Sequence, residues 1–60
     1  MDETKFKVGD FVIVNDEWKG KIVGVRFDTD NEPIYAVEDQ DNDVYDMSEF
    51  ELELETMEEN

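Results

Sequence analysis

The apolar residues of this chain fall into short runs that alternate with polar positions and are separated by polar turns. The first run, Val8–Val14, is rich in β-branched and aromatic residues, and Asn15 begins the turn that ends it. Gly20 precedes the second run, Lys21–Phe27, in which Gly24 indicates a bulge or a bend. Both runs are predicted to be β-strands.

Two more strands are predicted in the middle of the chain. A polar loop over residues 28–33 leads to a third strand, Ile34–Val37. The acidic segment Glu38–Asp43 is a predicted turn with residues 41–42 at its tip, because asparagine tolerates the left-handed conformation that such turns need. A short fourth strand over Val44–Met47 follows this turn.

The last segment fits two structures. Its apolar residues at 50, 52 and 54 alternate with glutamates, which is typical of a half-buried strand. A helix is also possible, because Ser48 and Glu51 have the spacing of a capping box and residues 50, 54 and 57 would share one helical face. The strand uses all three large apolar residues, whereas the helix exposes Leu52. We therefore predict one helical turn near Ser48–Phe50 and then a strand over Glu51–Glu55.

Five short strands without a long helix predict an all-β domain. The 60 residues suffice for one domain over 1–60, with an ordered part of about 6–55 and flexible ends at 1–4 and 56–60. A sheet this small must close or nearly close, since long exposed edges pair with other chains. We therefore expect a strongly bent five-stranded barrel with a short helical turn before the last strand.

Alternation along the predicted strands divides the apolar residues into two sets. The set expected to face the core is Val8, Val12, Val14, Val23, Val25, Phe27, Tyr35 and Val37. The set on the opposite face is Phe11, Ile13, Ile22 and Ile34. Strong curvature would shift the register and bury this second set, whereas regular strands would leave it as an exposed surface for a partner or a second copy.

Four segments resemble one group of small domains. Phe6–Val14 has the order hydrophobic-x-x-Gly-Asp-x-Val-x-Val, and Gly20–Val25 has the order Gly-x-Ile-x-x-Val. Tyr35-x-Val37 before an acidic turn and Ser48-Glu49-Phe50-Glu51-Leu52 before the last strand continue the pattern. Over about residues 6–54 the chain is similar to the SH3-like small barrels, which include KOW, Tudor-like and CarD-type RNA-polymerase-interaction domains. The resemblance implies the barrel fold and no particular function, because these barrels have many unrelated binding functions.

The charge of the chain is distributed very unevenly. Residues 1–26 hold all five bases and five of the nineteen acids and are neutral, so residues 27–60 hold the other fourteen acids and the whole net charge of −14. Such a field repels nucleic acids and membrane surfaces and attracts basic proteins. KOW-type nucleic-acid binders are usually basic, and this chain departs from them. Direct nucleic-acid binding through Lys5, Lys7, Lys19, Lys21 and Arg26 is therefore disfavoured.

The acidic residues are the candidate binding site. Glu49, Glu51, Glu53 and Glu55 are expected to form a row on one face of the last strand. Alternate residues on such a face lie about 6.6–6.8 Å apart, which is close to the spacing of roughly 6–7 Å between successive phosphates. The residues expected to engage a basic partner are Asp39, Asp41, Asp43, Asp46, Glu49, Glu51, Glu53 and Glu55. We expect a non-enzymatic binding protein, in its sharpest form an inhibitor of phage or mobile-element type that mimics DNA and occupies a nucleic-acid-binding protein. The competing interpretation is a solvated face that serves solubility only.

An adaptor is the alternative function. In that case the chain docks on RNA polymerase or another complex through its apolar edge, and the charge serves solubility. Ionic strength separates the two functions, because an acidic interface weakens steeply with salt and an apolar one does not.

Calcium binding through the third turn is not supported by the spacing. Asp39-Gln40-Asp41-Asn42-Asp43 begins like an EF-hand loop, which requires glycine at position six and glutamate at position twelve. Val44 and Phe50 stand at those positions, and Pro33 replaces the glycine of the similar segment 28–32. No dedicated metal site is predicted.

Most of the aromatic residues are expected in the core of so small a domain. Trp18, between the first two strands, is expected at the surface. In Tudor-like domains an aromatic cage beside carboxylates holds a methylated lysine or arginine by cation–π contact. We regard a core role as the more common use of such rings.

The sequence contains little that could perform catalysis. It has no histidine and no cysteine, so Ser48 and the threonines have no base to activate them. A carboxylate pair needs a cleft, and a chain this short is not expected to form a pocket of the usual ~300–1,000 Å³. We therefore expect no enzyme activity and no cofactor. The longest apolar run is too short to cross a bilayer, and the acidic first residues do not resemble a signal peptide, so we expect a cytoplasmic protein without a membrane partner.

Overall fold

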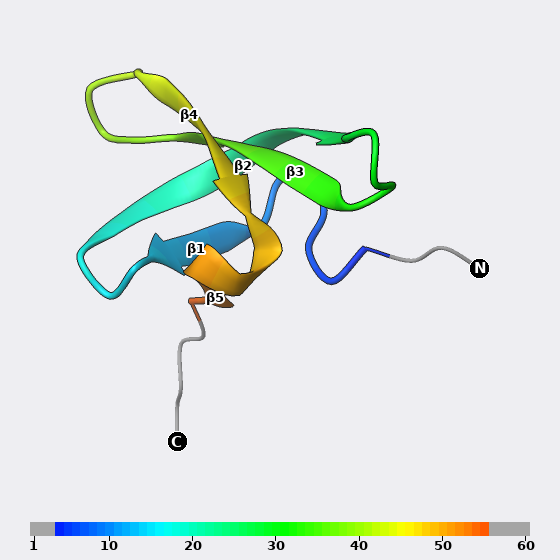
Figure 1. Ribbon diagram of the computed structural model, residues 1–60. Coiled ribbons are helices and arrows are strands. Elements are labelled where there is room, and N and C mark those ends of the chain that lie inside the picture. Colours follow the sequence, from blue (N-terminus) through cyan, green and yellow to red (C-terminus); the bar gives the residue numbers. More distant parts are fainter. Residues whose placement is uncertain (1–3, 56–60) are drawn as a thin grey trace.

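The computed structural model describes residues 4–55, which form one antiparallel sheet of five strands (Figure 1). The elements are β1 (Phe11–Val14), β2 (Trp18–Phe27), β3 (Pro33–Glu38), β4 (Val44–Ser48), the 3₁₀ turn η1 (Glu49–Glu51) and β5 (Leu52–Leu54). The all-β prediction is confirmed, and η1 lies directly before the last strand as expected. Apart from Thr4, the ends predicted to be flexible, 1–4 and 56–60, lie outside the described residues.

The sheet is open. Its strand order is β4-β3-β2-β1-β5, so the chain runs as a meander through β4 and then returns to pair β5 with β1. Figure 1 shows the long β2 extending from the side of β1 and β5 to the side of β3 and β4. Within residues 4–55 the edge strands β4 and β5 do not pair with each other, and the expected closure of the sheet is not found.

A bulge in β2 decides which residues face the core. Ile22 pairs with Val37 and Gly24 with Ala36, so Val23 is an extra residue without a partner on β3. The irregularity indicated by Gly24 is confirmed. Its effect on the faces differs from regular alternation at two residues: Ile22 is fully buried, as a shifted register predicts, and Val23 is 41% exposed. Val25 packs against the core as expected, whereas Phe27 at the end of β2 is 50% exposed.

Within the described residues the core consists of seven buried apolar side chains, with Trp18, Val25 and Met47 packed against them. These residues are Phe6, Val12, Val14, Ile22, Tyr35, Val37 and Leu52. Val8, which was expected to face inward, is 61% exposed. It precedes β1 in a turn where Asp10 N donates to Lys7 O and Gly9 has a positive φ, so it does not follow the alternation of the strand. Phe6 fills the core instead.

Two acidic turns have the same construction. In the β2–β3 turn, Asp28 Oδ1 accepts hydrogen bonds from the backbone N–H groups of residues 30 and 32. In the β3–β4 turn, Asp39 Oδ1 accepts from those of residues 41 and 43. Asn31 and Asn42 occupy equivalent positions with φ of 66° and 69°, a region that asparagine tolerates better than most residues. The first aspartate of each turn therefore stabilises the turn itself.

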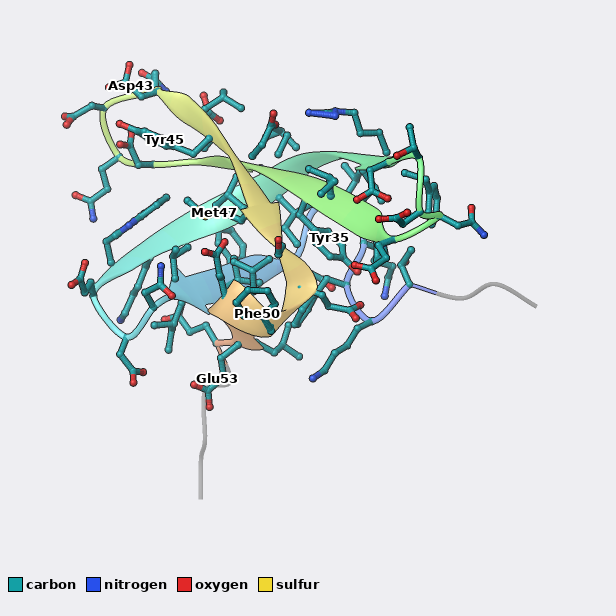
Figure 2. The ribbon with its side chains drawn as sticks, in the orientation of Figure 1. Tyr35, Asp43, Tyr45, Met47, Phe50 and Glu53 are labelled. Carbon is teal, nitrogen blue, oxygen red and sulfur yellow. The ribbon has the colours of Figure 1, made fainter. Side chains whose placement is uncertain are left out.

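Tyr35 connects the core to η1. Its hydroxyl donates to Glu49 Oε2 at 2.9 Å and accepts from the backbone N–H of Phe6 at 3.3 Å. The same carboxylate oxygen accepts from the N–H of Lys5. This network attaches the segment before β1 to the turn before β5, and Figure 2 shows Tyr35 beside the ribbon of η1.

Candidate functional site

The eight predicted acidic residues do not form one continuous surface along the last strand. Glu49 and Glu51 lie in η1 and only Glu53 lies within β5, so the predicted straight row of glutamates on one strand does not form. The row requires four alternating strand positions, and the 3₁₀ turn takes up the first two. Figure 2 shows Asp43 at the β3–β4 end of the molecule and Glu53 at the opposite end.

Four of the eight carboxylates have partners outside the β3–β4 turn. Asp46 pairs with Arg26 across β3, and Glu55 pairs with Lys19 at 3.2 Å. Glu49 accepts from the Tyr35 hydroxyl, and Glu51 Oε1 accepts from the backbone N–H of Ser48, which is one half of the predicted capping box. Of the remaining four, Asp39 accepts only from the backbone of its own turn, and Asp41, Asp43 and Glu53 have no partner among residues 4–55.

Three of the remaining carboxylates lie together in the β3–β4 turn. One ligand oxygen each of Asp39, Asp41 and Asp43 lies within 4.8 Å of the others. Asp41 and Asp43 are exposed and Asp39 is half-buried. Among residues 4–55 no basic side chain forms an ion pair with any of them. Within residues 4–55 this turn is the one place where three acidic side chains approach one another so closely.

Two aromatic rings from different hairpins meet beside this turn. Trp18 pairs with Val14 and Tyr45 with Val37, and both partners are buried, so both aromatic side chains project from the core-facing side of the sheet. Their ring centroids are 5.5 Å apart in a T-shaped contact at 61°. Trp18 is half-buried and Tyr45 is 43% exposed. Trp18 is thus at the surface only in part, because its ring also packs against the core.

Gly20 makes room for this arrangement. A Cβ atom at position 20 would lie 2.6 Å from Cγ1 of Val37 and 3.1 Å from Cζ3 of Trp18. Only a residue without a side chain allows the Trp18 ring and Val37 to approach the backbone of β2 so closely. Since Tyr45 is the partner of Val37 on β4, the glycine also brings the two rings into reach of each other.

The rings and the acidic turn line an open hollow of about 550 Å³, the Trp18–Tyr45 pocket. It is lined by Trp18, Lys19, Asp39, Gln40, Asp41, Tyr45 and Met47. A second hollow of about 390 Å³ shares Lys19, Asp39 and Gln40 with it and continues to Phe11. The expectation that so short a chain forms no pocket of this size was wrong, because the open sheet leaves the space between the two hairpins unfilled.

The potential of the pocket is negative. Repulsion from Asp43, and then from Asp39, raises the pKa of the Tyr45 hydroxyl above its ordinary value of 10.0, with smaller contributions from burial and Asp41. Lys19 is the one base in the described lining, and its Nζ is held by Glu55. The pocket therefore combines aromatic surface with uncompensated negative charge.

Sequence reasoning named the acids of this site but did not assemble the pocket. Trp18 and Tyr45 belong to strands that are not neighbours in the sheet, so no local pattern relates them. Gly20 was a usable signal, because a glycine within a strand, two residues after a tryptophan on the same face, can mark a close approach.

Apolar residues are also exposed elsewhere. Phe50 in η1 is 87% exposed, and Phe11, assigned to the outer set, is 56% exposed. Of the rest of that set, Ile13 and Ile34 are half-buried and Ile22 is in the core. These residues do not form the single outer surface that regular strands predict.

Comparison with protein-family models, with curated proteins and with solved structures finds no match for this chain. In the described residues no helix is long and apolar enough to cross a membrane.

Proposed function

We propose that this chain is an acidic binding protein that engages a basic surface of another protein, with the β3–β4 turn at the centre of its interface. The observation that carries the proposal is the division of the acids: half of the eight candidates are paired with groups outside the β3–β4 turn, while Asp39, Asp41 and Asp43 are clustered and form no ion pair with a base among residues 4–55. A purely solubilising surface gains nothing from such clustering, because adjacent like charges repel.

The kind of partner follows from the sign and density of this charge. A protein groove that binds phosphates presents lysine and arginine at short spacing, and a cluster of carboxylates meets the same side chains. We therefore propose a nucleic-acid-binding protein as the partner, and inhibition by occupation of its phosphate groove as the function. Glu53 and the partly neutralised Asp46, Glu49, Glu51 and Glu55 extend the negative field around the turn.

We also propose that the fold is an open member of the SH3-like small barrels. The return of β5 to β1 and the 3₁₀ turn directly before β5 support this assignment. The unpaired edges of β4 and β5 are the feature in which the sheet differs from a closed barrel.

Capture from a bacterial lysate tests the function, with the tagged protein eluted first by stepwise salt and then by competitor DNA. The site variant is Asp41→Asn with Asp43→Asn. The matched control is Asp30→Asn with Glu32→Gln, which removes the same charge from the turn of the same construction at the β2–β3 end. We expect the wild type and the control to capture a nucleic-acid-binding protein that both eluents release, and the site variant to lose most of it.

Two results would contradict the proposal. If no captured protein distinguishes the site variant from the control, the β3–β4 turn is not the interface. If the partner resists both salt and DNA, the function moves to the exposed apolar residues, as in the adaptor alternative.

A further inference from the structure

We infer that the Trp18–Tyr45 pocket receives one unmodified arginine side chain of the basic partner. This inference rests on the proposed function and names the contact that anchors it. The pocket lies beside the most concentrated negative charge of the described chain and is the larger of the two hollows that adjoin the β3–β4 turn.

The aromatic lining is suited to a flat cation. In the T-shaped contact the edge of one ring covers a face of the other, so the rings are not stacked and ring faces remain for a ligand. A guanidinium group stacks on tryptophan or tyrosine faces and is attracted by their quadrupole. Met47 adds a polarisable apolar wall at the base of β4.

The carboxylates that line the pocket favour a cation with several N–H donors, as in an unmethylated guanidinium group. Asp39 uses Oδ1 to hold the turn, which leaves Oδ2 free of the turn, and the carboxylate of Asp41 has no partner among residues 4–55. Guanidinium N–H groups bind carboxylates in a bidentate manner while the plane of the group still stacks on a ring. A lysine ammonium offers no plane to stack, and methylation of arginine removes donors.

The position of Lys19 does not prevent cation binding. Lys19 lines the pocket, but its Nζ lies 3.2 Å from Glu55 Oε2, and this ion pair neutralises its charge. The other bases of residues 4–55 do not line the pocket. An incoming guanidinium therefore meets a net negative site.

Trp18 supplies a specific reporter, because it is the only tryptophan of the chain. Hexa-arginine and hexalysine peptides of equal charge are titrated at low salt, and binding is followed by Trp18 fluorescence and by the NMR signal of its indole N–H. We expect the arginine peptide to bind roughly three- to fivefold more tightly and to shift the indole signal. Tyr45→Leu should remove this preference, while Tyr45→Phe and the exposed control Phe50→Leu should retain it.

The outcomes separate this inference from the proposed function. Equal binding of both peptides with an unshifted indole signal overturns the arginine site and leaves the acidic interface standing. Failure of both peptides to bind the wild type more tightly than Asp41→Asn with Asp43→Asn contradicts the proposed function itself. Tighter binding of a peptide with dimethylated arginine would also overturn the inference, because the pocket would then favour methyl groups over N–H donors.

Discussion

Single residues carry much of the specificity of this small fold, and Tyr35 is the clearest case. Its ring is fully buried and makes a T-shaped contact with Phe6, with ring centroids 5.4 Å apart. Its hydroxyl is bonded to Glu49 and to the N–H of Phe6. A buried polar group is costly without such partners, so this hydroxyl and its partners are tied to one arrangement of the chain.

Tyr35→Phe should lower the free energy of unfolding by about 1–2 kcal/mol, because the ring is kept while the N–H of Phe6 loses its buried acceptor. Urea denaturation followed by Trp18 fluorescence measures the loss. The control is Tyr45→Phe, whose hydroxyl is exposed and which should change the stability by less than about 0.5 kcal/mol. Equal effects of the two substitutions would contradict a structural role for the Tyr35 hydroxyl.

The stability should also depend on Tyr35 at alkaline pH. Burial is the main cause that raises the pKa of Tyr35 above 10.0, because it disfavours the charged phenolate. In the unfolded chain the tyrosine ionises near pH 10. The contribution of Tyr35 to the free energy of unfolding is therefore complete below about pH 10, the pKa in the unfolded chain. This contribution is lost as the pH rises through the higher pKa of Tyr35 in the folded protein. Tyr35→Phe should flatten this alkaline decline in unfolding experiments between about pH 9 and 12. If Tyr35→Phe leaves the slope of stability against pH unchanged in this range, the ionisation of Tyr35 is not the cause of the decline.

The pKa of Tyr45 reports the field of the acidic turn. Asp43 is the largest cause of its increase, so Asp43→Asn should lower the pKa of Tyr45 toward its ordinary value. Asp30→Asn, in the equivalent β2–β3 turn, should leave it unchanged. NMR titration of the tyrosine ring signals separates Tyr45 from Tyr35. A Tyr45 pKa that responds equally to both substitutions would mean that it senses only the total charge.

At the scale of the elements, β2 determines the shape of the sheet. It pairs with β1 through residues 18–21 and with β3 through residues 21–27, and the bulge at Val23 lies in the second part. Gly20 and Gly24 mark the two places where this strand departs from regular packing. The space at Gly20 is filled by Val37 and Trp18, whereas Gly24 faces only Ala36 at 3.6 Å.

Gly20→Ala should destabilise the protein by about 2–3 kcal/mol, because its Cβ would lie 2.6 Å from Val37 and 2.8 Å from the carbonyl oxygen of Glu38. Gly24→Ala should change the stability by less than about 1 kcal/mol, because its Cβ makes only an ordinary contact. Thermal unfolding by far-UV circular dichroism compares the two. A Gly24→Ala variant as unstable as Gly20→Ala would contradict crowding at Gly20 as the cause, because the Cβ at position 24 has room.

The whole molecule is dominated by its charge. The net charge of −14 on 60 residues belongs entirely to residues 27–60. Among residues 4–55, ion pairs involve only Asp46 and Glu55 of these acids. Repulsion within a compact chain opposes folding, and salt weakens this repulsion. Among the bases of the first half, Lys19 and Arg26 pair with Glu55 and Asp46, whereas Lys5 and Lys21 lie near the rings of Phe6 and Phe11.

The melting temperature should therefore rise clearly between about 0.01 M and 0.15 M NaCl, as the screening length falls from about 30 Å to about 8 Å. The rise should be smaller in the variant Asp41→Asn with Asp43→Asn, because the densest cluster of charge is then reduced. Thermal unfolding at the two salt concentrations measures both. A flat response of the wild type would mean that the acids are too dispersed to destabilise the fold.

Local patterns predicted most of the elements correctly. The five strands lie where β-branched and aromatic residues alternate with polar ones, and the helical turn before the last strand appears within one residue of its predicted place. These features depend on neighbouring residues in the chain. Regular alternation exchanged the faces of Ile22 and Val23, because one extra residue at the bulge reverses the alternation along β2 and its effect depends on the partner strand.

The sequence alone determined the strands, the two acidic turns and the sign of the chain's net charge, since these depend on residue type and local order. Only the tertiary structure decided which of these acids are bonded to distant parts of the chain. Asp46, Glu49 and Glu55 find their partners on segments distant in the sequence, and those of the β3–β4 turn do not. It also decided that Trp18 and Tyr45 form a pocket, because their contact requires the fold to bring two separate hairpins together around Gly20.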